Sequence, residues 1–439
     1  MKIKLYILTI MLFSMLHADY YLMPSARAQS KIDNMPKATI LDMQTIPQNP
    51  NAYAAQIKPF HTSEQKKLDN EYNERYFAPW SMSDINISAE DFGWEVRFVR
   101  KKPIYTVSAK IIPPNIYEEW ITNAQMELFN TQKIKAITIK RTNLKSLPTK
   151  ESFYRDPHET GEGFPFDYNQ NSAYPPNMPL LISHFSKDGK WAFVHGAYAF
   201  GWLDIKDIAM ADDDFIKKFK NGRYAITVKD NLRLYENTKP ISLVKLGTLF
   251  PYDNEGYFFA TRDKKGMAKL NKAKPTHRGI IASKPVAFTP HNVSRIAGAF
   301  IDEPYGWGEN YETRDCSALT RDFFAPFGIF LERNSSDQAK DGTQIPLLGL
   351  SADEKKAKIL KDAVPFRSML FVPGHIVLYM GQFQGEPVIM HSYWGIRQQD
   401  FSKLITGRTI ITTTQPGKEL PFVRKESQLI ETLQSIVLF

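Results

Sequence analysis

Short apolar runs separated by tight turns follow one another through the middle of the chain. Asp188-Gly189 marks one such turn, because this pair tolerates the positive φ of a short hairpin. Many short strands with close turns are typical of small β-barrels, so the pattern predicts two of them in tandem, at 134–215 and 216–280. The first set of predicted strands lies at 134–140, 179–185, 191–194 and 201–204, and the second at 224–228, 232–235, 243–249 and 256–260.

The region before these barrels, 19–133, is polar and mixed. It contains two predicted helices, at 63–75 and 115–132, and several prolines interrupt it. We interpret it as a mainly helical cap or spacer. With 43% hydrophobic and 13% aromatic residues, the chain has enough apolar material for several packed cores, and its 439 residues suggest two to four domains.

The first 18 residues have the features of a secretory signal peptide. A basic start with Lys2 and Lys4 precedes an apolar run at 5–16, and the small residue Ala18 stands before Asp19. We therefore expect cleavage after residue 18 and a periplasmic or otherwise exported protein. No cysteine follows the run, so no lipid anchor is expected, and no later segment approaches ~20 apolar residues, so we expect no integral membrane segment after signal removal.

The charge balance favours an anionic partner. The formal charge of +9 falls to about +7 when Lys2 and Lys4 leave with the signal peptide. Nucleic acid, an acidic polymer and a membrane surface are all compatible with this charge. Because an exported protein meets cell wall more often than nucleic acid, we expect a cell-wall partner and no nucleic acid.

Cys316 is the single cysteine of the chain, so an intramolecular disulfide is excluded. Either reactivity or a buried apolar role remains. The surrounding pattern predicts a helix that starts at Asp315, carries Leu319 and Phe323 on one face and stops before Pro326. In the first turn the helix dipole favours the thiolate, so we expect a lowered pKa and a nucleophile at Cys316.

Two histidines supply the base that a thiol nucleophile needs. Apolar runs at 371–380 and 388–393 flank the loop 381–386, which predicts a hairpin. If its centre is Phe383, His375 directly opposes His391, with Cβ atoms ~5 Å apart. His391 would then orient His375, and His375 would accept the proton of Cys316. A register slip of one residue would place the two rings on opposite faces.

Several motifs resemble a known set of domains. Residues 181–194 and Gly201-Trp202-Leu203, together with Gly163-Phe164-Pro165-Phe166-Asp167, resemble the bacterial SH3-like domains that precede cell-wall peptidases. Residues 246–251 match the same pattern more weakly, and residues 75–80 resemble the N-terminal stabilising segment of such peptidases. Residues 304–308, 315–317, 373–381 and 390–392 resemble the motifs of the NlpC-type (NlpC/P60) papain-like peptidases, in the order found in that family.

The resemblance implies an α+β architecture. The catalytic domain would span 281–439, with the cysteine-bearing helix packed on an antiparallel sheet. Two SH3-like barrels and the mainly helical N-terminal region would precede it. The chain has Ala318 where many relatives have glycine, and the spacings around Cys316 and His375 differ from the common ones, which alters loops.

The resemblance also implies roles for individual residues. Cys316 would be the nucleophile, His375 the general base and acid, and His391 the orienting residue. Tyr305 would help to bind the oxyanion together with the backbone amide of Cys316, although packing alone would also explain this tyrosine.

Substrate binding is implied for a second group of residues. Asp315 and Ser317 flank the nucleophile, and in relatives that act on free muropeptides such residues bind the amine of the terminal L-alanine. Asp315 has the alternative role of a helix N-cap. The acidic partner expected from the first SH3-like domain has two candidates, Asp167 and Glu162.

The predicted function is hydrolysis of the amide between γ-D-glutamate and a diamino acid, meso-diaminopimelate, in murein stem peptides through a thioacyl intermediate. We expect a monomer with peptidoglycan or muropeptides as its partner and no metal or organic cofactor. Three alternatives stay open: an inactive wall-binding protein, an acyltransferase on the same scaffold, and zinc binding by Cys316, His375 and His391. The zinc alternative lacks paired, closely spaced ligands.

Overall fold

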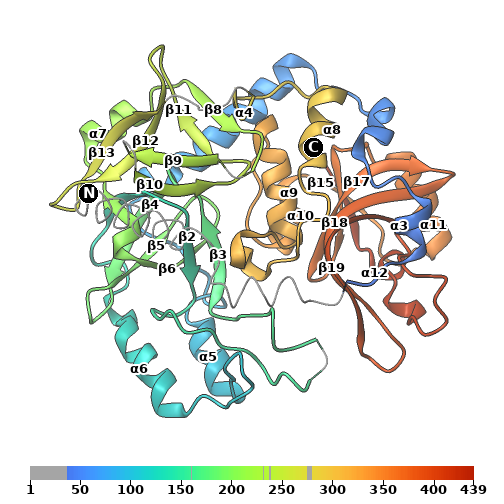
Figure 1. The fold of residues 1–439 in the computed structure, drawn as a ribbon, viewed down its shortest axis with the longest axis horizontal. Helices are drawn as coiled ribbons and strands as arrows, with labels where there is room; N and C mark the ends of the chain where they lie inside the picture. Colours follow the sequence, from blue (N-terminus) through green and yellow to red (C-terminus); the bar gives the residue numbers. More distant parts are fainter. Residues whose placement is uncertain (1–36, 160, 231, 237–238, 274–278) are drawn as a thin grey trace, which may run out of the picture.

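The computed structural model describes residues 37–159, 161–230, 232–236, 239–273 and 279–439. The predicted signal peptide lies outside the described residues. Two groups of strands occupy opposite sides of the molecule, and helix α9 (Cys316–Phe324) lies between them (Figure 1). The α+β prediction is confirmed, since strands β1–β14 form the barrel-like half and β15–β20 form the sheet of the C-terminal half.

The N-terminal region is mainly helical, as predicted. Its helices are α3 (Leu41–Thr45), α4 (Thr62–Phe77), α5 (Trp94–Lys101) and α6 (Pro114–Ala124), with 3-10 turns η1 (Pro50–Gln56), η2 (Ala78–Trp80) and η3 (Met126–Leu128). The predicted helix at 115–132 is shorter in the structure. Gln125 adopts the left-handed conformation, which ends α6.

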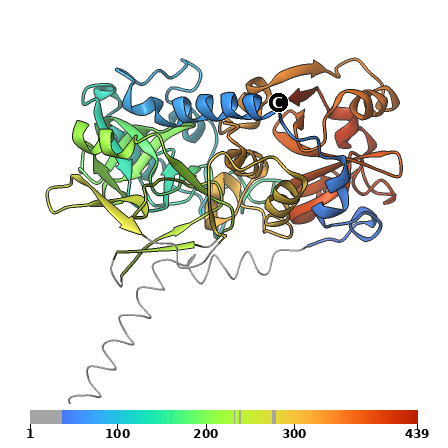
Figure 2. The ribbon, with the colours of Figure 1, turned by 90° about the horizontal axis from the view of Figure 1, so that it is seen from above.

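This region ties the two halves of the molecule together. Helix α4 lies across both halves when the molecule is seen from above (Figure 2). On the barrel side, Tyr76 donates its hydroxyl to the Asn177 carbonyl at 2.9 Å, and Trp80 Nε1 donates to the Ala136 carbonyl at 2.8 Å. On the other side, the Ala38 N–H donates to the Ile405 carbonyl at 2.7 Å. The placement of the barrels beside the C-terminal half therefore depends on residues far away in the sequence.

The first barrel is an antiparallel sheet of seven strands in the order β3-β2-β6-β5-β4-β1-β7. The four predicted strands correspond to β1, β4, β5 and β6, and the prediction missed β2, β3 and β7. The connection between β2 and β3 carries residues 146–169, which reach the C-terminal half. The strands are β1 (Ile134–Thr138), β2 (Thr142–Lys145), β3 (Gln170–Tyr174), β4 (Pro179–Phe185), β5 (Trp191–His195), β6 (Phe200–Asp204) and β7 (Ile208–Met210).

The second group of strands follows helix α7 (Asp213–Phe219) and is divided among three small sheets. These are β11-β8-β14, β10-β9 and β12-β13, all antiparallel. Strand β14 lies just beyond the predicted boundary at residue 280 and pairs with β8. The strands are β8 (Tyr224–Thr227), β9 (Leu232–Glu236), β10 (Lys239–Val244), β11 (Leu249–Pro251), β12 (Tyr257–Arg262), β13 (Ala268–Ala273) and β14 (Ile281–Ser283).

The C-terminal half contains an antiparallel sheet in the order β15-β20-β16-β17-β18-β19. Helix α9 packs on β17 and β18 and buries Leu319 and Phe323 in the main core. The strands are β15 (Thr343–Pro346), β16 (Ser368–Val372), β17 (His375–Phe383), β18 (Glu386–Arg397), β19 (Lys403–Thr413) and β20 (Ser435–Leu438). The helices are α8 (Pro290–Gly298), α9, α10 (Ser335–Asp341), α11 (Ala352–Asp362) and α12 (Leu429–Thr432), with 3-10 turns η5 (Trp307–Glu312), η6 (Ala325–Phe327) and η7 (Lys425–Ser427).

Within the described part of the chain, no helix combines the length and the apolar character needed to cross a membrane.

Candidate active site

Cys316 is the first residue of α9, as predicted. The Asp315 side chain caps the helix by accepting the Ala318 N–H at 2.9 Å, so its N-cap role is confirmed. The Cys316 sulfur accepts a hydrogen bond from the backbone N–H of Ile376, the residue after His375. The start of α9 and the start of β17 therefore meet at the thiol.

Burial, and not the helix dipole, dominates the ionisation of this thiol. Cys316 is 9% exposed, and burial together with the neighbouring Asp315 carboxylate raises the pKa of its thiol to about 12. The expected lowering of the pKa is therefore wrong for the free protein. Amides of the first turn and of Ile376 oppose the rise without cancelling it. Cys316 is a neutral thiol until a proton acceptor takes part in the reaction.

The two predicted histidines lie together. His375 Nε2 and His391 Nδ1 are 3.0 Å apart, and both rings are held against Tyr393, which stacks on His391 with a centroid distance of 4.4 Å. The predicted register is nevertheless wrong. The hairpin turns at Gln384-Gly385, with φ values of 52° and 78°, and not at Phe383. Continuing the observed register places His391 level with Val377, so the two histidines are diagonal and not directly opposed.

A β-bulge brings the two imidazoles to the same face of the sheet. Tyr379 pairs with Ile389 but Gly381 pairs with Val388, so Met380 is an extra residue in β17. Without it, the register near the turn would continue unchanged and set His391 opposite Leu378. His375, three residues from Leu378, would then point to the other face. Gly381 accommodates the bulge with a φ of 116°.

A chain of hydrogen bonds sets the proton positions on both rings. The Thr412 hydroxyl donates to the Thr413 carbonyl at 2.7 Å, so its oxygen accepts the proton of His391 Nε2, which is 3.2 Å away. His391 Nδ1 is then the acceptor for the Nε2–H of His375. This assignment, made from the network, leaves Nδ1 of His375 without a proton. The unprotonated nitrogen is the one required for a general base.

Both rings are neutral in the free protein. Burial lowers the pKa of His375 to about 4, and burial followed by the proximity of His375 lowers the pKa of His391. Together with the raised pKa of Cys316, this gives a resting site made of a thiol and two neutral imidazoles. In this resting state the proton is on the sulfur of Cys316 and not on His375.

Tyr305 lies beside the thiol. It is 7% exposed, and burial followed by the proximity of Cys316 and Asp315 raises the pKa of its hydroxyl well above the ordinary value. The hydroxyl therefore keeps its proton and can act as a donor. The ring contacts Phe166 and Trp394, with centroid distances of 6.4 and 5.6 Å. Phe166 comes from the 146–169 connection of the first barrel, so that barrel forms one wall of the site.

The residues predicted to bind an amine have different environments. The Asp315 carboxylate accepts five hydrogen bonds, from Ala318 N, Gly308 N, the Ser317 hydroxyl and two nitrogens of Arg333. These bonds fill its acceptor capacity of about four lone-pair positions. The Ser317 hydroxyl also accepts from Arg333 Nη1 at 2.8 Å. The side chains of both Asp315 and Ser317 are therefore occupied by protein groups.

The two acidic candidates from the first barrel also differ from each other. Asp167 is 0% exposed and accepts from Ser152 Oγ, Phe153 N and Asn169 N at 2.7 to 3.2 Å, which ties it into the barrel. The structure gives Asp167 no route to a substrate. Glu162 is partly exposed and accepts the Tyr168 hydroxyl at 3.0 Å. Tyr168 packs on Trp307 next to Tyr305, so Glu162 lies at the rim of the site.

Three family models match the chain in succession. Residues 5–129 match the N-terminal NLPC_P60 stabilising domain, residues 152–204 match an SH3 domain of the SH3b1 type, and residues 302–411 match the NlpC/P60 family. Residues 302–411 of the chain therefore form an NlpC/P60 domain. The third match contains Cys316, His375 and His391 and ends one residue before Thr412.

One solved structure has the same fold over nearly its whole length. An NlpC/P60 endopeptidase from Photobacterium damselae subsp. piscicida is 21% identical and superposes with a TM-score of 0.82 over 92% of this chain and 99% of its own. An NlpC/P60 family protein from Bacillus cereus ATCC 10987 is 14% identical, with a TM-score of 0.43 over 69% of this chain and 98% of its own. No curated protein sequence matches the chain. The first structure shows that the multidomain arrangement is shared over nearly the whole length.

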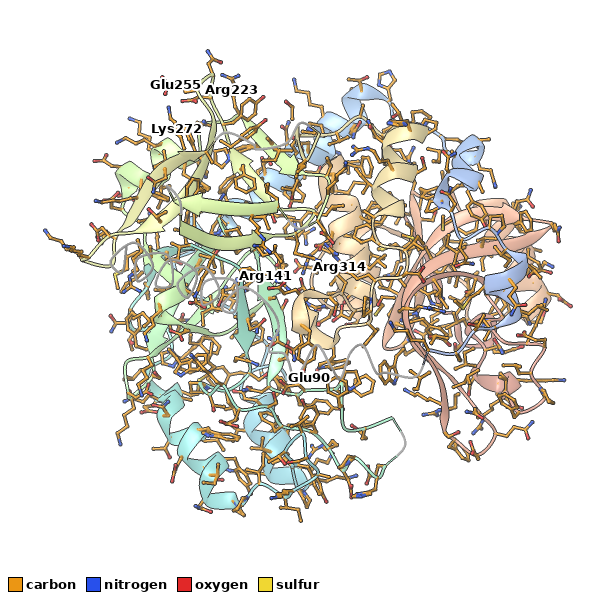
Figure 3. The ribbon with its side chains drawn as sticks, viewed as in Figure 1. Glu90, Arg141, Arg223, Glu255, Lys272 and Arg314 are labelled. Atoms are coloured by element: carbon orange, nitrogen blue, oxygen red, sulfur yellow. The ribbon has the colours of Figure 1, made fainter. Side chains whose placement is uncertain are left out.

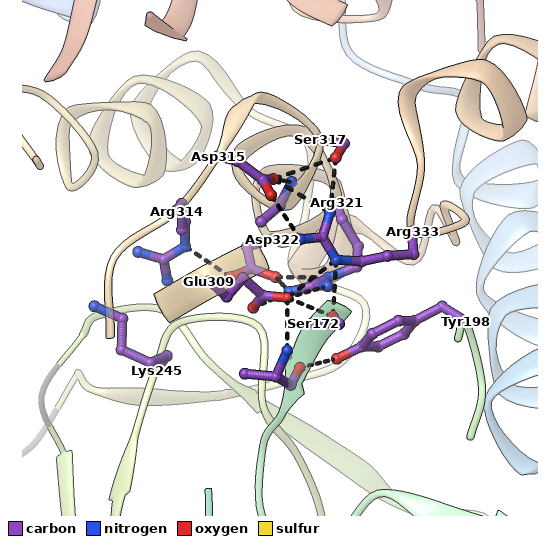
Figure 4. Close-up of polar contacts among 12 residues, drawn as sticks. Ser172, Tyr198, Lys245, Glu309, Arg314, Asp315, Ser317, Arg321, Asp322 and Arg333 are labelled. Atoms are coloured by element: carbon purple, nitrogen blue, oxygen red, sulfur yellow. Dashed lines mark hydrogen bonds and ion pairs between the residues drawn. The ribbon is translucent and has the colours of Figure 1, made fainter. Parts of the chain in front are cut away.

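A buried network of charges behind the NlpC/P60 site was missed by sequence reasoning. Arg333 forms an ion pair with Asp315 at 2.6 Å and donates to Ser172 of the first barrel at 2.8 Å. Glu309 accepts from the same serine and from Arg321 (Figure 4). The members named above are 0 to 8% exposed, so a buried network joins the barrel to the start of α9.

The network extends further toward the second group of strands. Arg314 donates to Asp322, Glu303 and Asp230, and Arg141, labelled with it near the middle of the view in Figure 3, donates to the Glu309 carbonyl at 2.9 Å. The alternation of positive and negative side chains in this network was not visible in the sequence, because the residues that form it are scattered between positions 141 and 333. The arginines that flank the nucleophile motif and the Glu309–Glu312 segment were the only local signal. Among the described residues, no group of three or more histidine, cysteine, aspartate or glutamate side chains could hold a metal ion.

Proposed function

We propose that this NlpC/P60 protein is an exported cell-wall cysteine endopeptidase that hydrolyses the amide between γ-D-glutamate and the diamino acid of peptidoglycan stem peptides. The observation that supports it most directly is the chain of hydrogen bonds from Thr412 through His391 to His375, which lies beside the Cys316 thiol. This order supplies a nucleophile, a base in the required tautomer and a group that holds the base in place.

The reaction follows from the positions of these groups. The sulfur of Cys316 attacks the carbonyl carbon while its proton moves to Nδ1 of His375, and His391 stabilises the resulting imidazolium. The Tyr305 hydroxyl and the backbone N–H of Cys316 donate to the oxyanion. Collapse of the tetrahedral intermediate expels the amine of the diamino acid, which takes the proton from His375. Water then hydrolyses the thioester with His375 as the base.

The role of Asp315 in this proposal is structural. Its five hydrogen bonds hold η5, α9 and the Arg333 loop together, so it fixes the position of Cys316 and does not bind the substrate amine. Glu162 remains a candidate for contact with the substrate at the rim, whereas Asp167 belongs to the barrel. The matched positions of the stabilising and SH3 domains support the domain limits proposed from the sequence, with β14 assigned to the second barrel.

The experiment is digestion of defined muropeptides by the purified mature protein, with products identified by mass spectrometry. Wild-type protein should release peptides with a new amino terminus on the diamino acid. Cys316→Ala, which removes the sulfur and keeps the helix former, should release none. Activity that survives a metal chelator but is lost on thiol alkylation would separate this mechanism from zinc chemistry. If wild-type protein releases no such amine while a known hydrolase succeeds in parallel, the proposal is wrong.

A further inference from the structure

Two cations face each other where β18 and β19 meet their connecting loop. Arg397 and Lys403 are directly paired in the register of the two strands. Like charges placed opposite each other on neighbouring strands destabilise the pairing. Among the described residues, neither of these side chains has a carboxylate partner in an ion pair. The protein therefore keeps an unfavourable arrangement at this point.

The pair is next to the active site. The ammonium group of Lys403 lies 5.7 Å from the centre of the Phe166 ring, and it occupies the space that a side chain at Gly161 of the same barrel connection would take. Phe166 in turn contacts Tyr305, Trp307 and Trp394. One aromatic ring thus separates Lys403 from the tyrosine that lies beside Cys316. Arg397 is exposed and Lys403 is half-buried, so solvent reaches both side chains.

The nearest acidic group does not neutralise the pair. Glu162 attracts Lys403 electrostatically, but its carboxylate accepts the Tyr168 hydroxyl and forms no ion pair with the lysine. Burial and the repulsion of Arg397 lower the pKa of the Lys403 ammonium group. A bound carboxylate would reverse both effects, because it would supply the missing counter-charge in a partly dry environment.

We propose that Arg397 and Lys403 form a carboxylate-binding subsite that selects stem peptides with a free carboxylate near the scissile amide. The inference rests on the proposed function. Two carboxylates of such a peptide share this chemistry: the α-carboxylate of γ-linked D-glutamate and the carboxylate of the diamino acid. Arginine and lysine bind either one through charge-assisted hydrogen bonds.

Three synthetic stem peptides test the subsite and distinguish its two sources. One carries both carboxylates, one has the D-glutamate α-carboxylate converted to an amide, and one has the diamino acid carboxylate converted to an amide. Wild-type protein should show a kcat/KM roughly tenfold lower for the peptide that lacks the recognised carboxylate, which is the size expected for one charge-assisted bond. The amide that lowers cleavage identifies the source.

Variants then assign the effect to the pair. Lys403→Gln and Arg397→Gln should each raise KM about tenfold for the peptide that carries both carboxylates. Neither variant should change the cleavage of the amidated peptide that wild type cleaves poorly, whereas Lys403→Arg should keep the wild-type selectivity. Lys425→Gln, an exposed lysine in η7, serves as the matched control and should behave as wild type.

The outcomes separate the inference from the proposed function. Equal cleavage of all three peptides by wild type overturns the subsite and leaves the endopeptidase intact. Selectivity that survives Lys403→Gln and Arg397→Gln also overturns it. If wild type cleaves none of the peptides while a known hydrolase does, both the endopeptidase and the subsite are overturned.

Discussion

Thr412 determines which nitrogen of His375 is free to act as a base. Its hydroxyl proton is committed to the Thr413 carbonyl at 2.7 Å, so its oxygen can only accept from His391. Thr412→Val keeps the shape of the side chain and removes this acceptor. His391 is 0% exposed, so no water replaces the lost partner, and its Nε2–H is left buried and unsatisfied.

The size of the effect follows from that unsatisfied group. Leaving a buried donor without an acceptor costs about 1–3 kcal/mol. The pair can avoid this cost by moving the proton of His391 to Nδ1, which then forces His375 to carry its own proton on Nδ1. In that tautomer His375 cannot accept the thiol proton. A penalty of about 1–3 kcal/mol on the active tautomer lowers kcat/KM roughly 5- to 150-fold.

The assay compares Thr412→Val with Thr412→Ser on one muropeptide substrate, with unfolding in urea measured for both. Serine keeps the hydroxyl, so we expect activity within a few-fold of wild type. Valine should lose activity through kcat with KM nearly unchanged, because ground-state binding does not involve the tautomer. If the valine variant is as active as the serine variant and equally stable, the hydrogen bond from His391 to Thr412 does not set the tautomer of His375, and the reasoning is wrong.

The other predictions concern ionisation, the buried ion pair and the substrate amine. Because the pKa of His375 is about 4 and that of Cys316 about 12, kcat/KM should fall only below about pH 5 and show no alkaline decline up to pH 10. For the same reason iodoacetamide should alkylate Cys316 slowly up to pH 9. Fast alkylation at pH 6 would indicate a preformed thiolate and contradict this prediction. The histidine pKa is depressed in the folded state, so its contribution to stability is present above about pH 6.5 and is lost as pH falls toward 4, which urea titrations across this range would detect. Arg333→Met should cost about 3–5 kcal/mol in the free energy of unfolding, because it leaves the Asp315 carboxylate buried without its counter-charge; a loss under about 1 kcal/mol would contradict this. Muropeptides with an acetylated L-alanine amine should be cleaved within a few-fold of free ones, since Asp315 is already occupied; a hundredfold preference for the free amine would refute that role of Asp315.

The helix that starts at Cys316 was predictable because its signals are local. An N-capping aspartate, apolar residues four apart and a proline at the end specify α9 without any contact from elsewhere. The strands β4, β5 and β6 were predictable for the same reason. Strands β2 and β3 were not, because the long connection between them hides their pairing from a search for close turns.

The histidine pair was predicted to meet, but for a reason that the structure corrects. The turn lies at Gln384-Gly385 and Met380 is an extra residue in β17, and together these two features place both histidines on one face of the sheet, as the prediction from a regular hairpin centred on Phe383 required. The bulge is supported from a distant part of the chain. Gln56 of η1 accepts the Gln382 N–H and donates to the Gln382 carbonyl, both at 2.9 Å. No pattern within the hairpin contains this contact.

By itself the sequence determined the residue types of the proposed triad, the helix start that carries the thiol and the order of the matched domains, because each depends on short-range periodicity and on motifs. Only the tertiary structure decided the ionisation of Cys316, the tautomer of His375 and the partner of Asp315. These properties depend on burial and on groups such as Thr412 and Arg333 that other elements bring to the site. Electrostatic energies in a dry interior follow distances in space, and distance along the chain does not predict them.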